Sequence, residues 1–287
     1  MTRDPERQRN RVLDTSAMER AFVAELRRKR RAGLVSLISL NLLGIVLFLL
    51  AWEVLPRVVP NVNILMFPPP SSVVDALLPL VVSGELASHI LISLQRAMAG
   101  FALATVLGIA AGLFTARIRV LQHITDPVLQ GFRSIPVIAL VPLSLIWFGI
   151  GEGSKIALVT WGAFFPIWIA SFIGVRDVHA VYLRSAASLG ANRRQTMLFV
   201  VLPSALPLVL AGLRQALAIA LIVLVAAEIA GARGGVAYMV AISHQLFRVD
   251  IMFIGLAVLG ALGFLLDRLF VVASRKLFPW YGQDPAV

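Results

Sequence analysis

The 287-residue sequence contains no cysteine, and charged side chains make up only 14% of it. Without cysteine there is no disulfide, no thiolate metal site and no cysteine nucleophile. The four histidines, His89, His123, His179 and His244, stand far apart with no pair at metal-ligand spacing. No nucleophile or metal constellation of a membrane-embedded enzyme is visible. We therefore expect no metal site, no cofactor and no catalytic residues.

The sequence also lacks a nucleotide-binding motif. Residues 149–155, Gly-Ile-Gly-Glu-Gly-Ser-Lys, superficially resemble a phosphate-binding loop. The Walker pattern requires glycine directly before the lysine and a strand-to-helix context, whereas this stretch is predicted to be a tight external turn between two apolar runs. If ATP powers this protein, its hydrolysis must therefore take place on another polypeptide.

Hydrophobic residues, in contrast, make up 59% of the chain. Apolar runs of about 20 residues are long enough to cross a bilayer as helices. The sequence therefore predicts an all-α, polytopic transmembrane bundle with six spans. The spans are predicted over residues 34–55, 86–116, 126–150, 156–175, 204–230 and 251–273.

These spans divide the chain into segments. Residues 1–33 form a basic cytoplasmic arm, and residues 34–85 hold the first span and an external loop with a short helix from Ser71 to Val82. Residues 86–273 form the transmembrane core, which contains a cytoplasmic segment over 176–203 and an external, glycine-rich loop over 231–250. Residues 274–287 are a cytoplasmic tail.

The net charge of +11 is unevenly distributed, since ten of the 26 lysines and arginines precede Gly33. Directly before an apolar run, this cluster predicts an anchor to anionic lipid on the cytoplasmic side. Nucleic-acid binding is not expected, because the interleaved aromatic residues of such modules are absent. With the N-terminus in the cytoplasm, inner segments hold eighteen lysines and arginines and outer segments hold four, as the positive-inside rule requires.

Two features inside the spans predict how the helices pack. Small residues recur at every fourth position of the second span, which favours close contact with another helix. They are Gly100, Ala104, Gly108, Gly112 and Ala116. Pro136 and Pro142 predict kinks in the third span, where a broken helix either lines a wet cavity or is a plain packing kink.

An ionisable side chain within a span is costly unless it faces protein or water, and six such side chains are the candidates for a special role. They are Arg96, Arg133, Arg214, Glu228, Asp267 and Arg268. Asp267 and Arg268 lie near the end of the last span and are expected at the interface. Arg96, Arg214 and Glu228 are candidates for the translocation pathway, because a guanidinium offers bidentate contacts to carboxylate, sulfonate or nitrate. The favoured alternative is an internal ion pair of these arginines with Glu228.

A polar passage from Arg184 to Gln195 separates the fourth and fifth spans. One helical stripe of it carries mostly small residues, which suits packing against another protein. The stripe consists of Leu183, Ala186, Ala187 and Gly190. Gly190 is predicted to end a helix in the left-handed conformation, and Asn192 with Gln195 to cap the next one. Pro203 and Pro207 predict a further helix start, so two short helices should meet at a corner before the fifth span.

This passage resembles the coupling loop of permease subunits in ATP-binding-cassette importers. The signature of that loop is Glu-Ala-Ala, three residues, Gly, nine residues, Ile, one residue, Leu-Pro. Ala186, Gly190 and Leu202-Pro203 match it at the right separation, and Val200 stands in for the Ile. Arg184 replaces the Glu and Ser185 the first Ala, which removes one expected polar contact with the ATPase.

Further motifs are similar to the nitrate, taurine and alkanesulfonate permease branch, in the order of that family from about Trp52 to Trp280. They are Phe67-Pro68-Pro69-Pro70, Ser83-Gly84-Glu85-Leu86, Ile135-Pro136, Trp147-Phe148-Gly149-Ile150-Gly151, Gly212-Leu213-Arg214 and Ala227-Glu228. The resemblance implies a type I importer permease fold in a bacterial inner membrane. It also implies import of a small, anionic solute by alternating access.

The resemblance further implies partners and coupling residues. The expected partners are cytoplasmic ABC ATPase subunits, a periplasmic solute-binding protein, a second permease subunit in a homodimer, and membrane lipid. The residues expected to couple to the ATPase are Arg184, Ser185, Ala186, Ala187, Gly190, Ala191, Asn192, Arg193, Leu202 and Pro203. The alternative is an ion-coupled secondary carrier, but no internal repeat is visible and only Glu228 is placed to carry protons.

Overall fold

The computed structural model describes residues 40–278, except residue 42 and residues 60–62. Within these residues every regular element is a helix. The chain forms two compact units, residues 1–71 and residues 72–287. The predicted basic arm, the beginning of the first span and most of the C-terminal tail lie outside the described residues.

The first unit contains a helix over residues 43–58, which continues beyond the predicted end of the first span, and the described residues 63–71 follow it. The indole Nε1 of Trp52 donates a hydrogen bond to the carbonyl oxygen of Pro68 at 3.1 Å. The amide and the hydroxyl of Ser71 both donate to the carboxylate of Glu53, at 3.1 and 2.9 Å. These bonds hold the proline-rich segment against the helix.

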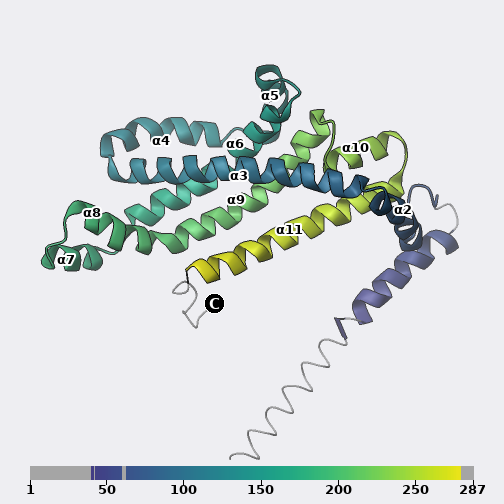
Figure 1. The fold of residues 1–287 in the computed structure, drawn as a ribbon, viewed down its shortest axis with the longest axis horizontal. Coiled ribbons are helices and arrows are strands. Elements are labelled where there is room, and N and C mark those ends of the chain that lie inside the picture. Colours follow the sequence, from purple (N-terminus) through teal and green to yellow (C-terminus); the bar gives the residue numbers. More distant parts are fainter. Residues whose placement is uncertain (1–39, 42, 60–62, 279–287) are drawn as a thin grey trace, which may run out of the picture. The chain divides into compact units, whose positions relative to one another are not determined.

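The helices that follow are drawn in Figure 1. They are α2 (Pro70–Val82), α3 (Glu85–Arg117), α4 (Arg119–Arg133), the 3₁₀ helix η1 (Val137–Leu140), α5 (Val141–Phe148), α6 (Glu152–Arg176), α7 (Ala180–Ser188), α8 (Arg193–Thr196), the π helix η2 (Met197–Val201), α9 (Leu202–Gly231), α10 (Val236–Gln245) and α11 (Val249–Leu277). The predicted short helix from Ser71 to Val82 is confirmed as α2.

Four helical stretches in the described residues are long and apolar enough to cross a membrane. They are α3, α6, the continuous stretch Arg193–Gly231 and α11. They confirm the predicted second, fourth, fifth and sixth spans, although several helices extend a few residues beyond the predicted ends. A further span forms if α4 and α5 cross the membrane together.

The kinked span predicted over residues 126–150 is confirmed in its kink at Pro136 and wrong in its start. Asp126-Pro127 does not open the helix, because α4 already begins at Arg119 and Pro127 lies inside it. The helix breaks before Pro136, and its two halves are bent by 88°, whereas Pro142 lies in the first turn of α5 and does not kink it. A proline disfavours helical geometry at the residue before it and has no amide to donate, which explains the position of the break.

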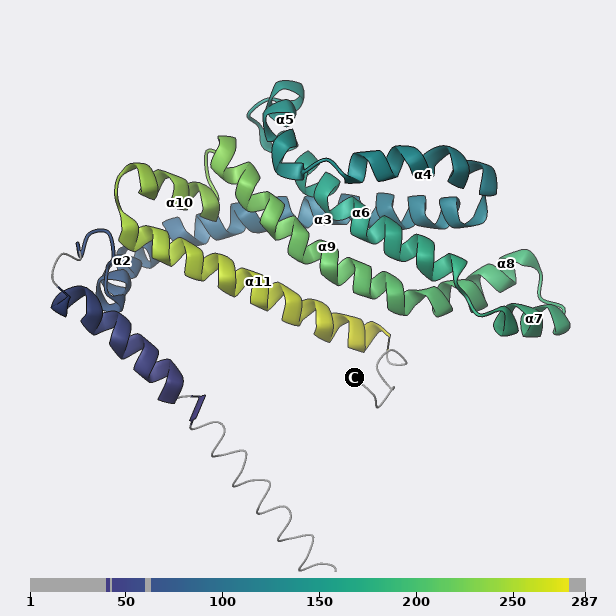
Figure 2. The same ribbon diagram turned by 180° about the vertical axis from the view of Figure 1, so that it is seen from behind.

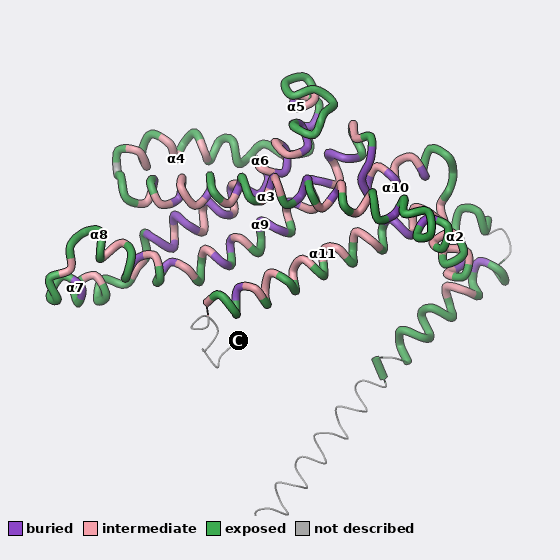
Figure 3. The backbone as a smooth tube through the Cα atoms, in the orientation of Figure 1, coloured by how far each residue is buried: buried purple, intermediate pink, exposed green. Residues whose placement is uncertain are grey.

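The centre of the second unit is a layer of three helices, α3, α6 and α9, packed side by side (Figures 1 and 2). The small residues of α3 make this contact possible. An added Cβ at Gly100 would lie 2.6 Å from Val159, and one at Gly108 would lie 2.9 Å from Ile167. The predicted packing stripe is thereby confirmed, and Figure 3 shows buried positions concentrated on these three helices.

The glycine-rich loop predicted over 231–250 is not irregular throughout, because half of it is the helix α10. Val236, Ala237, Met239 and Ser243 of this helix are buried. Figure 2 shows α10 lying beside α11. The turn before α10 is fixed by side chains from α3 and α9, which sequence spacing alone does not reveal.

Candidate functional site

The passage between α6 and α9 forms the predicted corner, which we call the elbow (residues 180–196). Gly190 has φ +76°, and its amide donates to the carbonyl oxygen of Ala187 at 3.0 Å. The side chain of Asn192 accepts from the amide of Gln195, and the side chain of Gln195 accepts from the amide of Asn192, both at 2.9 Å. This reciprocal capping box confirms the two cap predictions. The elbow is therefore a defined turn of the backbone.

The predicted small-residue stripe divides between the inside and the outside of the protein. Ala186 is buried, and Leu183 packs with Val175 and Val201 at the ends of α6 and η2. Ala187 and Gly190 are exposed. The expectation that all four residues form one contact face for a partner is thus wrong, because the apolar members are used to attach the elbow to its own bundle.

Leu189 is the most exposed of the large apolar side chains of the elbow, with 87% of its surface exposed, against 50% for Val181 and 57% for Tyr182. Arg184, Ser185, Asn192 and Arg193 are exposed around it, and Ala191 is half-buried. Leu189 was missed because it lies off the small-residue stripe. An isolated large apolar residue next to a glycine cap was the signal in the sequence that could have identified it.

α9 begins at Leu202, as the prediction from Pro203 requires, but the elbow continues into it without a break over Arg193–Gly231. Leu202 and Pro203 occupy the first turn of α9, and Pro207 lies inside it. The π-helical residues Met197–Val201 precede them. Prolines at these positions leave carbonyls of the preceding turn without their usual amide partners, and a wider turn accommodates this loss. The second half of the elbow and α9 therefore form one continuous helical stretch.

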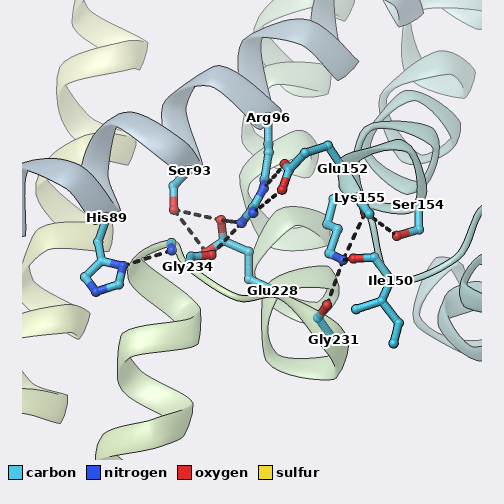
Figure 4. A network of polar contacts seen from close by, with 12 residues as sticks. His89, Ser93, Arg96, Ile150, Glu152, Ser154, Lys155, Glu228, Gly231 and Gly234 are labelled. Atoms are coloured by element: carbon cyan, nitrogen blue, oxygen red, sulfur yellow. Dashed lines mark hydrogen bonds and ion pairs between the residues drawn. The ribbon is translucent and has the colours of Figure 1, made fainter.

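A polar cluster lies at the other end of α6 and α9, in which Ser93, Arg96, Lys155 and Glu228 are buried and Glu152 is exposed (Figure 4). The guanidinium of Arg96 donates to Glu228 at 3.0 Å and to Glu152 at 2.6 Å. It also donates to the carbonyl oxygen of Gly234 at 2.6 Å. Arg96 and Glu228, both predicted for the pathway, are thus brought together as the ion pair that was the favoured alternative. Their contact with a solute stays a prediction.

Glu228 joins the end of α9 to the beginning of α10. Its carboxylate accepts from the hydroxyl of Ser93 at 2.8 Å and from the amide of Ala237 at 3.0 Å. The Ser93 hydroxyl in turn accepts from the amide of Val236 at 2.8 Å. The first amides of a helix have no partner inside it and attract negative charge. Side chains from α3 and α9 thereby cap α10 in place of a local residue.

The turn before α10 depends on a glycine at this position. Gly235 has φ +117°, and a Cβ added there would collide with the carboxylate of Glu228. Its amide donates to Nδ1 of His89 at 3.0 Å. His89 is therefore part of this turn. Among the described residues, no group of acidic residues, histidines or cysteines could hold a metal ion.

Lys155 and Glu152 complete the cluster, and sequence reasoning missed both by assigning residues 149–155 to an external turn. They lie in the first turn of α6. The ammonium of Lys155 is 1% exposed and donates to the carbonyl oxygens of Gly231 at 2.7 Å, Gly151 at 3.0 Å and Ile150. The cluster contains two cations and two carboxylates: Arg96, Lys155 and Glu228 are buried, and the exposed Glu152 completes the balance of charge.

Arg214, the third residue predicted for the pathway, does not lie in this cluster. Its guanidinium forms a bidentate pair with Asp267 of α11, at 2.6 and 2.9 Å. The expected pair of Arg214 with Glu228 is therefore wrong. Asp267, placed at the interface from the sequence, instead joins α11 to α9.

Comparison with known proteins assigns the chain to a family. The family described as binding-protein-dependent transport system inner membrane component matches residues 104–279. The taurine transport system permease protein TauC of Escherichia coli (strain K12) is 37% identical over 224 residues, which cover 76% of this chain and 82% of TauC. The putative aliphatic sulfonates transport permease protein SsuC of Bacillus subtilis (strain 168) is 37% identical over 219 residues, covering 76% of this chain and 79% of SsuC.

Solved structures show the same fold. A chain of the inward-facing MetNI methionine ABC transporter superposes with a TM-score of 0.59 at 21% identity, covering 68% of this chain and 97% of that chain. The family match includes the elbow, α6, α9 and the C-terminal part of α3, and the relatives extend it over most of the chain. The chain belongs to the binding-protein-dependent transport system inner membrane components: it is a permease subunit of an ABC importer, whose ATP is hydrolysed by a separate subunit.

Proposed function

We propose that this permease imports a small organic anion of the taurine or aliphatic sulfonate class, as one half of a homodimer in a bacterial inner membrane. The observation that carries the solute class is the 37% identity with TauC and with SsuC, named for taurine and for aliphatic sulfonates. Nitrate stays within the class of small anions expected from the sequence motifs. A periplasmic binding protein delivers the solute, and two cytoplasmic ATPase subunits supply the energy.

The elbow is the part that docks on the ATPase in this proposal. Its turn is rigid, because the capping box and the Gly190 turn satisfy the backbone groups that two meeting helix ends expose. Leu189 projects from it and fits an apolar pocket on a partner. Arg184, Ser185, Ala187, Gly190, Ala191, Asn192 and Arg193 surround that contact, while Ala186, Leu202 and Pro203 attach the elbow to the bundle.

Closure of the ATPase pair moves the two elbows together and changes the side from which the solute pathway is open. Movement reaches the membrane through α6 and α9, which approach closely next to the elbow, where a Cβ added at Gly174 would lie 3.1 Å from the carbonyl oxygen of Ala205. Close-packed interfaces move as units and do not deform gradually. The positive-inside rule supports this orientation, with the elbow in the cytoplasm.

Gly190→Arg tests this proposal in the assembled transporter. The left-handed backbone disfavours arginine, and the long side chain occupies the docking surface, although an added Cβ itself meets nothing within 4 Å. We expect the variant to insert into the membrane normally, to co-purify with less ATPase and to lose uptake of radiolabelled taurine or ethanesulfonate.

Gly84→Arg is the matched control, because Gly84 also has φ +76° and open space around its Cβ but precedes α3, far from the elbow in the chain. It should keep the ATPase bound. Normal uptake and normal ATPase recovery in Gly190→Arg would refute the coupling role. Failure of the unaltered transporter to import any sulfonate would refute the solute class alone.

A further inference from the structure

Arg133 differs from the other arginines in the membrane-spanning part of the chain. Arg96 and Arg214 each pair with a carboxylate, and the guanidinium of Arg268 lies over an aromatic ring. Arg133 forms no hydrogen bond or ion pair within the described residues. A charge without a partner inside a membrane is costly, so its position requires water or a ligand.

Arg133 lines a cavity of about 510 Å³ between α6 and α9, close to the bend that separates α4 from α5. Gln215 of α9 is the other polar side chain of the lining, which contains no acidic residue. The rest is apolar, and includes Phe165 and Ile169 of α6 with Leu208 and Ile219 of α9. A mostly apolar cavity of this size with a few polar groups is typical of a small-molecule site.

A second unused hydrogen-bond donor lies next to this cavity. The indole of Trp161 packs edge-on against Phe132 at 5.5 Å and against Phe165 at 5.6 Å. Its Nε1 is buried and has no acceptor in the described part of the chain. Buried indole N–H groups usually find a partner. The region around Arg133 is therefore supplied with donors and short of acceptors, which favours an anion.

Arg133 is exposed where it lines this cavity. It lies fourteen residues after the first residue of α4, which corresponds to about 21 Å of helix. If α4 and α5 cross the membrane together, this length places Arg133 well inside a hydrocarbon layer of about 30 Å and away from the lipid headgroups at the start of α4. The occupant that this position favours is a soluble anion.

The cavity adjoins a second one that leads to the elbow. Ile173 and Leu208 line both, and the second cavity, of about 450 Å³, extends to Asp177, His179 and Tyr182. The groove between α6 and α9 thus connects Arg133 with the side of the membrane on which the elbow lies. A solute released by Arg133 has a route out along it.

We propose that this cavity binds the transported anion during passage, with Arg133 contacting its acid group and the apolar wall contacting its carbon chain. The inference rests on the proposed function and narrows it. An apolar wall beside one cation suits an aliphatic sulfonate better than nitrate, which has no apolar part. Arg133, and not Arg96 or Arg214, is then the cation that meets the solute, because those two are held by carboxylates.

The natural absence of cysteine allows a direct test in the full transporter. A single cysteine is introduced as Gln215→Cys, and its reaction rate is measured with an anionic and a cationic methanethiosulfonate reagent of similar size. Arg133 should favour the anionic reagent, so Arg133→Gln should lower the ratio of the two rates by about tenfold. Arg133→Lys, which keeps the charge, should keep most of the ratio.

Ethanesulfonate in excess should slow the labelling of Gln215→Cys in the Arg133 background more than nitrate at equal concentration. A single Gln245→Cys on α10, outside the cavity, gives the control rate, which Arg133→Gln and ethanesulfonate should leave unchanged. The inference is overturned if the rate ratio is the same in all three Arg133 backgrounds. It is also overturned if anionic lipid alone accounts for the slower labelling of Gln215→Cys, or if nitrate slows this labelling as much as ethanesulfonate does. Normal sulfonate uptake together with either result would leave the proposed function intact.

Discussion

The packing of α3 and α9 against the beginning of α10 depends on two residues, Arg96 and Glu228. Arg96 is 4% exposed and Glu228 is fully buried, and each is bonded to several partners. Burying a charge without partners is strongly unfavourable, whereas a fully hydrogen-bonded pair is tolerated. The pair therefore stabilises the contact between α3, α9 and α10 at the place where these three segments meet.

Arg96→Gln should destabilise the protein by about 3–5 kcal/mol, because it leaves the Glu228 carboxylate buried without its cation. The measurement is thermal unfolding of the purified transporter in detergent. Arg248→Gln is the control, since Arg248 pairs with Asp250 but is about half exposed, and such pairs contribute about 0–1 kcal/mol. Equal unfolding temperatures for the two variants would contradict this stabilising role of the Arg96–Glu228 pair.

At the scale of helices, the contact between α3 and α6 is set by the glycines of α3. The backbone of α3 lies so close to the side chains of α6 that there is no room for a Cβ at Gly108, which would lie 2.9 Å from Ile167. Apolar helices gain no hydrophobic free energy by leaving lipid, so their association depends on such close packing.

Gly108→Leu should therefore force α3 away from α6 and reduce the yield of folded, detergent-stable protein several-fold. Gly260→Leu on α11 is the matched control, because nothing lies within 4 Å of an added Cβ there. The check is size-exclusion chromatography of both variants as fluorescent fusions. A monodisperse, full-yield Gly108→Leu protein would show that the close contact is dispensable.

The sequence predicted those helices whose signals are local. Apolar length located α3, α6, α9 and α11, and the Asn192–Gln195 spacing located the second half of the elbow. It did not predict α10, whose first amides are satisfied by Ser93 and Glu228, residues more than a hundred positions and nine positions away respectively. Nor did it predict the 88° bend, because a proline indicates a break but not its angle.

The residues of the candidate sites divide in the same way, into those with a local signal in the sequence and those whose position depends on distant contacts. The elbow was identified from spacing alone, whereas the outward position of Leu189 depends on which face of α7 packs on the bundle. Arg96 and Glu228 were singled out as ionisable residues inside spans, but Glu152, which pairs with Arg96, and the neighbouring Lys155 appeared to belong to a loop. Arg214 was assigned the wrong partner because two acidic residues, Glu228 and Asp267, were available and sequence does not give distance.

At the scale of the whole permease, the elbow and the polar cluster lie at opposite ends of α6 and α9. α6 alone has 25 residues, so about 37 Å of helix separates the two. The elbow end is joined to the bundle by an apolar cluster and a continuous helix, and the other end is held by buried charges. Such a layer moves as a unit when one end is displaced, which is what a subunit that depends on a separate ATPase requires.

The most direct measurement of this account is cross-linking from the tip of the elbow. Leu189→Cys places one thiol in a chain that otherwise has none, at a side chain that is 87% exposed. In membranes containing the whole transporter, a short bifunctional reagent should join this cysteine to the ATPase subunit, and the yield should change when ATP binds. Labelling of the same cysteine by an impermeant thiol reagent added outside intact cells, with no ATPase adduct under any nucleotide condition, would contradict the account.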